Sequence, residues 1–150
     1  MFLASALLSA TCLGQTFGTW KLNAARSTFS AGAPLKSLVV RIEPHPKGEV
    51  FTLDRIEADG RTTSSSTILY FDGEPRRFDD FGCSGIQSSR RPDDRTVEIV
   101  RMCASGEWIR LLRRVPAKSN ELVLEITEQS ADGRRFERRL ILENDRRTSQ

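Results

Sequence analysis

A two-residue alternation of apolar and polar side chains, cut at short intervals by glycine turns, limits what this chain can fold into. In the segment 36–44, Leu38, Val40 and Ile42 fall on one face. Successive side chains of a strand point to opposite faces, so this pattern predicts a strand with one buried face. No stretch repeats apolar residues at helical spacing over enough length to indicate a long helix. The best candidate for a short helix is the linker 23–35, and the fold class expected is all-β.

The same alternation recurs along most of the chain. The strands it predicts are 15–22, 36–44, 48–57, 61–71, 96–103, 107–115, 121–129 and 134–143. Glycine turns follow at Gly60, Gly73, Gly106 and Gly133, three of them as Asp-Gly, a strong hairpin signal. The segment 78–94 is rich in Gly, Ser, Pro and Asp, and is expected to be an irregular loop with at most one short strand. Consecutive hairpins favour an up-and-down antiparallel β-barrel of about eight to ten strands.

The charge of the chain is weaker than that expected of a dedicated nucleic-acid binder, so no nucleic-acid partner is predicted. The 150 residues fit one domain, and 23 basic against 20 acidic residues give a net charge of +3, a mild excess. Most basic residues are arginines, often in adjacent pairs such as Arg138-Arg139. Neighbours in a strand face opposite sides, so such pairs build no one-sided patch. They are interpreted as solvated charge that protects a β surface, with an anionic partner as the alternative.

The first 14 residues are short and apolar, carry no charged side chain and end in small residues. They are too short to span a bilayer, which takes about 20 apolar residues, and are typical of a secretory signal. The predicted organisation is a signal peptide at 1–14, a barrel at 15–145 and a disordered tail at 146–150. The usual basic start is missing, so an N-terminal helix is an alternative, and lipid attachment at Cys12 is a weaker one. The expected location is secreted or periplasmic.

Export changes the interpretation of the three cysteines. Without Cys12, the two that remain predict a disulfide between Cys83 and Cys103 in an oxidising compartment. Closing a loop of about 20 residues stabilises a fold by about 3 kcal/mol in the chain-entropy treatment. Two buried free thiols are the alternative. Neither cysteine has metal-ligand spacing or a nearby histidine, so no zinc site is expected.

The stretch Gly18-Thr19-Trp20 on the first predicted strand resembles the G-x-W signature of the lipocalin and fatty-acid-binding-protein superfamily. The chain also looks like small exported bacterial lipocalin-like proteins, with Ser27–Phe29 in the place of their linker, and the resemblance in pattern covers most of 16–143. It implies that Trp20 packs on the core floor of a barrel and that Gly18 lets the chain pass beneath it. It also implies that an arginine of the final strands, Arg138 or Arg139, meets the indole ring. The family's R-x-Y carboxylate clamp is absent, since Leu140-Ile141-Leu142 occupies that place.

The resemblance implies a non-catalytic, monomeric protein without a cofactor that binds a small apolar or amphipathic molecule. The apolar residues expected near its cavity are Phe51, Leu53, Tyr70, Phe78, Phe81 and Trp108. The alternative is a filled barrel that acts as a structural or interaction module of the cell envelope through its arginine-rich surface.

Catalysis is not expected from these residues. His45 is the only histidine, and its flanking prolines predict an exposed loop position. No nucleophile elbow, phosphate-binding loop or zinc-protease motif is present. The acidic pairs Asp79-Asp80 and Asp93-Asp94 are interpreted as turn formers or solvated charge, and calcium is the metal they would suit best if any.

Overall fold

Strands account for most of the computed structural model, which describes residues 16–29, 34–80, 83–117 and 120–145. In chain order the elements are β1 (Gly18–Leu22), the 3₁₀ turn η2 (Ala24–Arg26), β2 (Thr28–Phe29), β3 (Ser37–His45), β4 (Gly48–Ile56), β5 (Thr62–Leu69), β6 (Arg76–Asp80), β7 (Cys83–Asp93), β8 (Thr96–Cys103), β9 (Trp108–Arg114), β10 (Glu121–Gln129) and β11 (Arg135–Asn144). The helical candidate in the linker is therefore a single turn, which the Asn23 side chain caps by accepting a hydrogen bond from the Arg26 amide.

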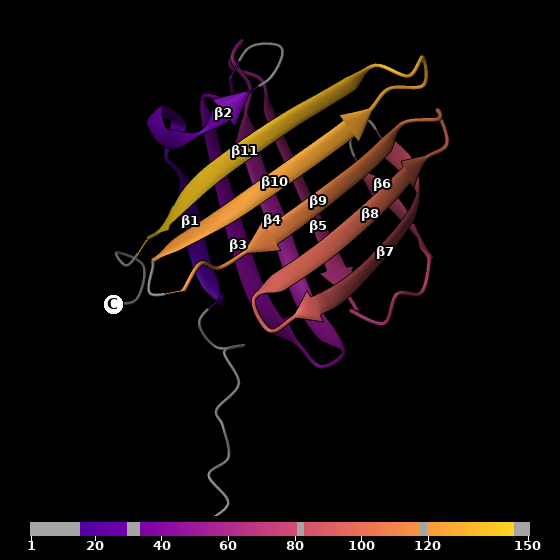
Figure 1. Cartoon of the computed structure of the whole chain (residues 1–150), viewed down its shortest axis with the longest axis horizontal. Helices are drawn as coiled ribbons and strands as arrows, with labels where there is room; N and C mark the ends of the chain where they lie inside the picture. The colour runs from indigo at the N-terminus through magenta and orange to yellow at the C-terminus, as the bar shows by residue number, and fades with distance from the viewer. Residues whose placement is uncertain (1–15, 30–33, 81–82, 118–119, 146–150) are drawn as a thin grey trace, which may run out of the picture.

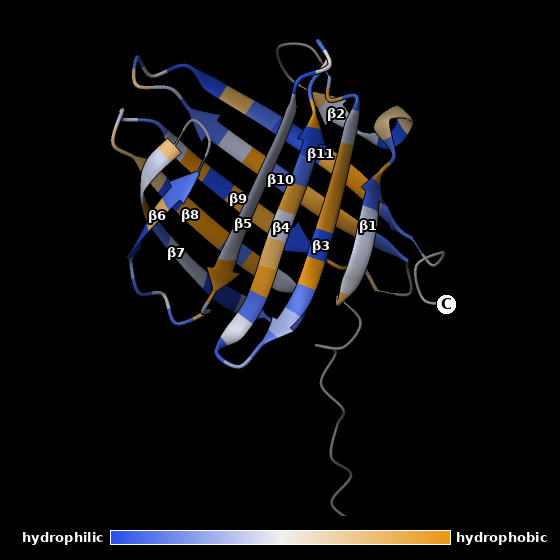
Figure 2. Cartoon of the chain, turned by 180° about the vertical axis from the view of Figure 1, so that it is seen from behind, coloured by the Kyte–Doolittle hydropathy of each residue, from blue (hydrophilic) through white to orange (hydrophobic). Residues whose placement is uncertain are grey.

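The strands form one antiparallel up-and-down barrel in the order β5-β4-β3-β1-β11-β10-β9-β8-β7-β6, with β2 paired to β11 (Figure 1). Consecutive strands pair as hairpins, and β1 joins the two halves by pairing with both β3 and β11. No ladder joins β5 to β6 among the described residues, so the ten-stranded barrel is nearly closed, with one seam between these edge strands (Figure 2). The predicted all-β barrel is confirmed.

The two-residue alternation explains which side chains fill the barrel. Val40 and Leu124 are fully buried, and their strand neighbours of the same parity are buried with them. The cluster comprises Trp20, Leu35, Leu38, Val40, Ile42, Phe51, Leu69, Val97, Ile99, Leu111, Leu122, Leu124, Leu140 and Leu142. Each such side chain contributes about 1.5–3 kcal/mol by leaving water, which makes this set the main source of stability.

Trp20 lies in this core with 2% of its surface exposed, and its indole nitrogen donates a hydrogen bond to the Thr16 carbonyl at 3.0 Å. The predicted arginine partner is not observed, because none of the arginine–aromatic contacts of the described residues involves Trp20. The register gives the reason. Trp20 pairs with Asn144 at the end of β11, whereas Arg138 and Arg139 pair with Phe29 and Thr28 of β2 further back along that strand.

The prediction of an irregular loop over 78–94 is wrong. This segment contains the end of β6 and all of β7, which has a register irregularity between Arg90 and Asp93. β7 was not predicted as a strand because two of its buried inward positions, Gln87 and Ser89, are polar. The glycine, serines and proline of this segment therefore belong to a strand with a buried polar face and an irregularity near its end, and not to a loop.

The predicted disulfide is present, joining Cys83 at the start of β7 to Cys103 at the end of β8 with a Cα–Cα distance of 5.0 Å. It fastens the strand next to the edge strand β6 to the rest of the sheet. The predicted signal peptide, Cys12 and the tail 146–150 lie outside the described residues. Within the described chain, no helix has the length and apolar character to cross a membrane.

We predict that Gly48→Ala destabilises the barrel through a backbone clash. An added Cβ would lie 1.8 Å from the Leu69 carbonyl oxygen of the neighbouring strand. Gly60→Ala is the matched control, since Gly60 also has a positive φ but nothing within 4 Å of the added atom. Overpacking should cost Gly48→Ala about 1–3 kcal/mol of unfolding free energy beyond that control. Equal denaturant midpoints for the two variants would contradict this close approach.

Candidate functional site

The seam between β5 and β6 holds a cavity of about 350 Å³ that opens to solvent. Side chains of both edge strands and of β7 and β8 surround it. Its lining includes Ser65, Thr67, Tyr70, Phe78, Gln87 and Arg101. Hydroxyl, amide and guanidinium groups thus share the lining with two aromatic rings, so the cavity offers both polar and apolar contacts.

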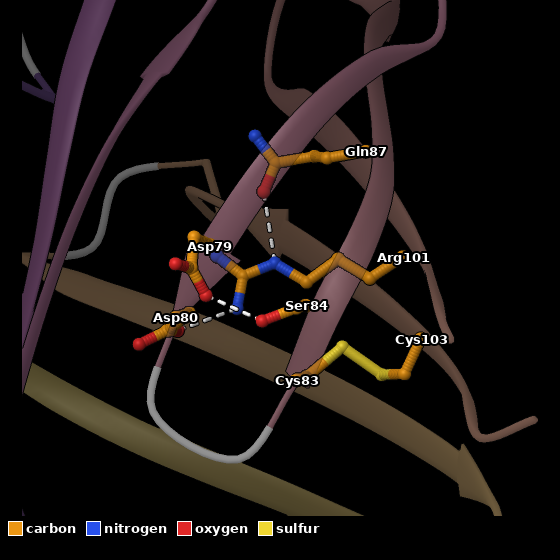
Figure 3. The surroundings of a disulfide bond; sticks show 7 residues. All are labelled: Asp79, Asp80, Cys83, Ser84, Gln87, Arg101 and Cys103. Atoms are coloured by element: carbon orange, nitrogen blue, oxygen red, sulfur yellow. Dashed lines mark hydrogen bonds and ion pairs between the residues drawn. A yellow bond between two sulfur atoms is a disulfide. The ribbon is translucent and has the colours of Figure 1, made fainter. Parts of the chain in front are cut away.

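Arg101 of β8 belongs to this lining, and its guanidinium lies between Gln87 and Asp80 (Figure 3). Its Nε donates to the Gln87 side-chain oxygen at 2.8 Å, and its Nη1 lies 3.0 Å from an Asp80 carboxylate oxygen. The guanidinium carbon also lies 4.8 Å from the centre of the Phe78 ring. Burial lowers the pKa of Arg101 and the Asp80 carboxylate opposes that effect, so the side chain remains a cation held in a defined position.

Side chains bridge the seam where the backbone does not. The Gln87 amide nitrogen of β7 donates to the Thr67 hydroxyl of β5 at 2.9 Å. Together with the Arg101 contacts, this forms a polar chain from Asp80 on β6 to Thr67 on β5. Side-chain bonds of this kind contribute about 1 kcal/mol each, so the seam is held more weakly than a paired ladder.

The link between β5 and β6 folds back over one end of the seam. The Phe71 amide donates to the Ser89 hydroxyl at 3.1 Å, and Phe71 is the one described non-glycine residue with a positive φ, 59°. The Arg76 guanidinium lies 4.0 Å from the Tyr70 ring centre and pairs with Asp72 at 2.6 Å. These contacts hold the pKa of the Asp72 carboxyl well below its usual range, mainly through the Arg76 hydrogen bond.

A buried ion-pair cluster lies inside the barrel beside the apolar core. Glu49 of β4 is 1% exposed, and its two carboxylate oxygens accept hydrogen bonds from Arg113 at 2.6 Å and from Arg91 at 2.7 Å. Arg113, itself 2% exposed, also lies over the Phe51 ring at 5.4 Å. Burial lowers the pKa of Arg113, and the Glu49 carboxylate opposes that effect. The ion pair joins β4 to β9 across the barrel interior and acts as a structural tie between these strands.

Of the six apolar residues predicted to lie near a cavity, only some line the seam. Tyr70 and Phe78 line it directly. Phe51 is 1% exposed and belongs to the core, with Leu53 packed against that core. Trp108 lies on the outward face of β9, because it alternates with the inward residue Leu111 and its neighbours of the same parity. It pairs with Met102 of β8, which is 61% exposed. Phe81 lies outside the described residues.

Sequence reasoning missed the polar members of the lining, Thr67, Gln87 and Arg101. The run of serines and threonines over 62–67 was the available signal, because alternate members of a strand must face inward. His45 also differs from its predicted loop position. It ends β3, is half-buried, and packs edge-on against Tyr70 with a centroid distance of 6.4 Å.

Three of the four acids in the two acidic pairs have structural partners. Asp80 pairs with Arg101, and Asp79 accepts a hydrogen bond from Ser84. Asp93 accepts from the Arg95 amide and the Thr96 hydroxyl in the β7–β8 turn, and these bonds lower the pKa of its carboxyl. Within the described ranges, no group of three or more His, Cys, Asp or Glu residues could hold a metal ion.

In comparisons with known proteins, no family model matches this chain and no curated protein matches it significantly. The class of the protein is therefore defined by its architecture, a nearly closed ten-stranded antiparallel barrel with a polar seam.

We predict that Glu49→Gln lowers the unfolding free energy by about 3–5 kcal/mol, because it removes the charge that compensates two arginines. Glu125→Gln is the matched control. Glu125 also faces two arginines, Arg114 and Arg139, but its side chain is 36% exposed, so the expected loss is about 0–1 kcal/mol. Urea unfolding at pH 7 makes the comparison. Similar losses of unfolding free energy for the two variants would mean that the buried cluster does not stabilise the barrel more than an exposed ion pair does.

Proposed function

We propose that this protein is an exported, non-catalytic, lipocalin-like binding protein that takes a small amphipathic molecule into its barrel at the β5–β6 seam. The observation that carries the proposal is the cavity of about 350 Å³ at the one interruption of the described sheet. Its volume falls within the range of about 300–1,000 Å³ typical of small-molecule sites. The lining comes from several strands, as in a site formed at the opening of a barrel.

The chemistry of the lining favours an amphipathic ligand over a purely apolar one. Tyr70 and Phe78 offer ring faces to an apolar body, although each ring also has an arginine beside it. Ser65, Thr67 and Gln87 offer hydroxyl and amide groups to a polar part. A purely apolar molecule would cover these polar groups without replacing the hydrogen bonds they make to water, at a cost in affinity.

Two observations support the remaining parts of the proposal. The Cys83–Cys103 disulfide fits an oxidising compartment outside the cytoplasm, in agreement with the apolar leader. The burial of Trp20 on β1 and the strand order agree with the lipocalin-like resemblance.

The alternative, an interaction module acting through surface arginines, has weaker support. Outward arginines are largely paired with carboxylates: Arg90 and Arg110 both contact Glu98, and Arg41 contacts Asp54. A paired arginine offers less net charge to an anionic partner than a free one.

We predict that the neutral dye N-phenyl-1-naphthylamine binds at the seam and that Ser65→Phe weakens binding at least about tenfold by filling the cavity. Thr62→Phe is the control, because Thr62 lies on the same strand but is exposed on its outer face. Dye fluorescence measures affinity, and near-ultraviolet circular dichroism checks that both variants fold. Failure of the dye to bind the wild type, or equal binding by both variants, would refute the seam as the site.

A further inference from the structure

The seam cavity lies along the edges of the two strands that border it. Successive side chains of a strand point to opposite faces of the sheet, so a cavity on one face is lined by every second residue. The seam cavity is instead lined by consecutive residues, 65–68 on β5 and all of β6. It therefore reaches both strand edges themselves, where the backbone is accessible.

The strand register shows which backbone groups of β5 point into the seam. The Glu57 amide donates to the Arg61 carbonyl at the turn between β4 and β5, which makes these two residues a hydrogen-bonded pair. Hydrogen-bonded and non-hydrogen-bonded pairs alternate along an antiparallel ladder. Ser66 and Ile68 belong to non-hydrogen-bonded pairs, so their N–H and C=O groups point away from β4 and into the seam.

The same alternation selects Arg77 and Asp79 on β6. The Ala104 amide donates to the Ser84 carbonyl, so Ser84 and every second residue of β7 after it bond on the β8 side. The other residues of β7 bond to β6, at Arg76 and every second residue after it. The N–H and C=O groups of Arg77 and Asp79 are left facing the seam. No backbone hydrogen bond between described residues satisfies these groups or their counterparts on β5.

β5 lacks the features that protect a strand edge from pairing. Edge strands of native proteins are usually short, or carry charged residues, proline or a bulge. β5 has eight residues, of which none is charged and none is proline, and its ladder with β4 runs without a register shift. β6 is protected, because it has five residues and four of them are charged. β5 is therefore the edge suited to accept another strand, with β6 as the opposite wall.

The position of β6 limits what can occupy that edge. β6 and the link before it face β5 across the seam (Figure 2), so a second barrel would meet them before its own sheet reached β5. A single extended segment has no such obstacle. The charges of the lining balance, with three arginines against three carboxylates: Arg76, Arg77, Arg101, Glu74, Asp79 and Asp80. Such a lining fits a segment of low net charge, since a strongly charged one would lose hydration without a net attraction in return.

We propose that the ligand of the seam is a short peptide segment of low net charge, which adds to β5 as a further strand. Its length matches the cavity-lining residues of the two edges, four on β5 and five on β6. It runs antiparallel to β5, the slightly more stable ladder, and bonds to the backbone of Ser66 and Ile68. Alternate side chains point inward towards Phe78 and outward to solvent, which makes the segment amphipathic. This inference rests on the proposed function and names the class of its ligand.

Two synthetic peptides that differ only in their backbone donors test the inference on the wild-type protein. The first is the pentapeptide Thr-Val-Thr-Val-Thr, acetylated and amidated at its ends, and the second carries N-methyl groups on its three central residues. The first should displace N-phenyl-1-naphthylamine at concentrations at least about tenfold lower than the second, because methylation removes the donors to the β5 carbonyls. Equal displacement by the two peptides, or displacement by neither, would overturn the inference.

Ser66→Pro tests the same bond from the side of the protein. It removes a seam-facing N–H without removing a bond of the β4–β5 ladder, and should weaken the first peptide at least about tenfold. Ser66→Ala is one control, because it keeps the N–H and removes only the hydroxyl, which lies 3.0 Å from the Thr52 hydroxyl. Thr62→Pro is the other, because Thr62 has the same parity on β5 but does not line the cavity. Both controls should stay within about twofold of the wild type, and an equal loss in either would contradict the proposed pairing.

Amide hydrogen exchange followed by NMR provides a measurement that needs neither the dye nor a variant. The first peptide should slow exchange at the Ser66 and Ile68 amides and leave the Thr62 amide unchanged. Unchanged exchange at Ser66 and Ile68 would refute the added strand. Sedimentation tests the other occupant of the edge: dimers of the peptide-free wild type that Ser66→Pro abolishes would mean that β5 pairs with a second copy.

The failures of the two proposals are distinguishable. If N-phenyl-1-naphthylamine does not bind the wild type, the proposed function fails, and the exchange measurement still tests the peptide directly. If the dye binds and Ser65→Phe blocks it, but the first peptide neither displaces it nor protects the β5 amides, only the peptide inference fails.

Discussion

The bond between Glu49 and Arg113 sets the geometry of the barrel interior. β4 and β9 lie on opposite walls, separated by four strands in one direction around the sheet, and the pair joins them at 2.6 Å with both side chains almost fully buried. Charges at this depth are tolerated only when each faces its partner in good geometry, so the pair holds the two walls in one register. The apolar cluster packs around it, and Arg91 brings β7 to the same carboxylate.

Closure of the barrel is achieved by two different means. On one side β1 pairs with β11 through the backbone, joining the first strand to the last. On the other side β5 and β7 are joined by the Gln87–Thr67 side-chain bond. The link after β5 is joined to β7 by the Phe71–Ser89 bond and by one isolated backbone bridge between Asp72 and Arg90. Side-chain bonds that face a solvent-open cavity separate at a smaller cost than a strand ladder, so local opening concentrates at the seam. The disulfide links β7 to β8 covalently. No ladder joins β5 to β6 in the described sheet, so these two edge strands are the ones expected to move apart from each other.

Strands could be predicted from the sequence where their inward side chains are apolar, and the prediction failed where the inward side chains are polar. Alternating Leu38, Val40 and Ile42 identified β3 and its buried face correctly, because hydrophobic burial produces the pattern being read. β7 was missed because Gln87 and Ser89 occupy its inward positions, and their burial is compensated by hydrogen bonds that sequence does not reveal. The site follows the same rule. Tyr70 and Phe78 were anticipated as aromatic side chains. Arg101 has the same parity as the buried Val97 and Ile99, but it was passed over because a charged side chain is not expected inside a barrel.

The arginines that face the barrel interior differ in how their charge is compensated. Arg113 is almost fully buried and pairs with a carboxylate, as expected of a structural tie, although its Nη1 makes no hydrogen bond. Arg101 has a carboxylate, an amide and a ring face, and it borders the cavity. Arg55 is only half-buried, so leaving its Nε without a hydrogen bond costs less than leaving an enclosed cation without a carboxylate, and the fold tolerates it.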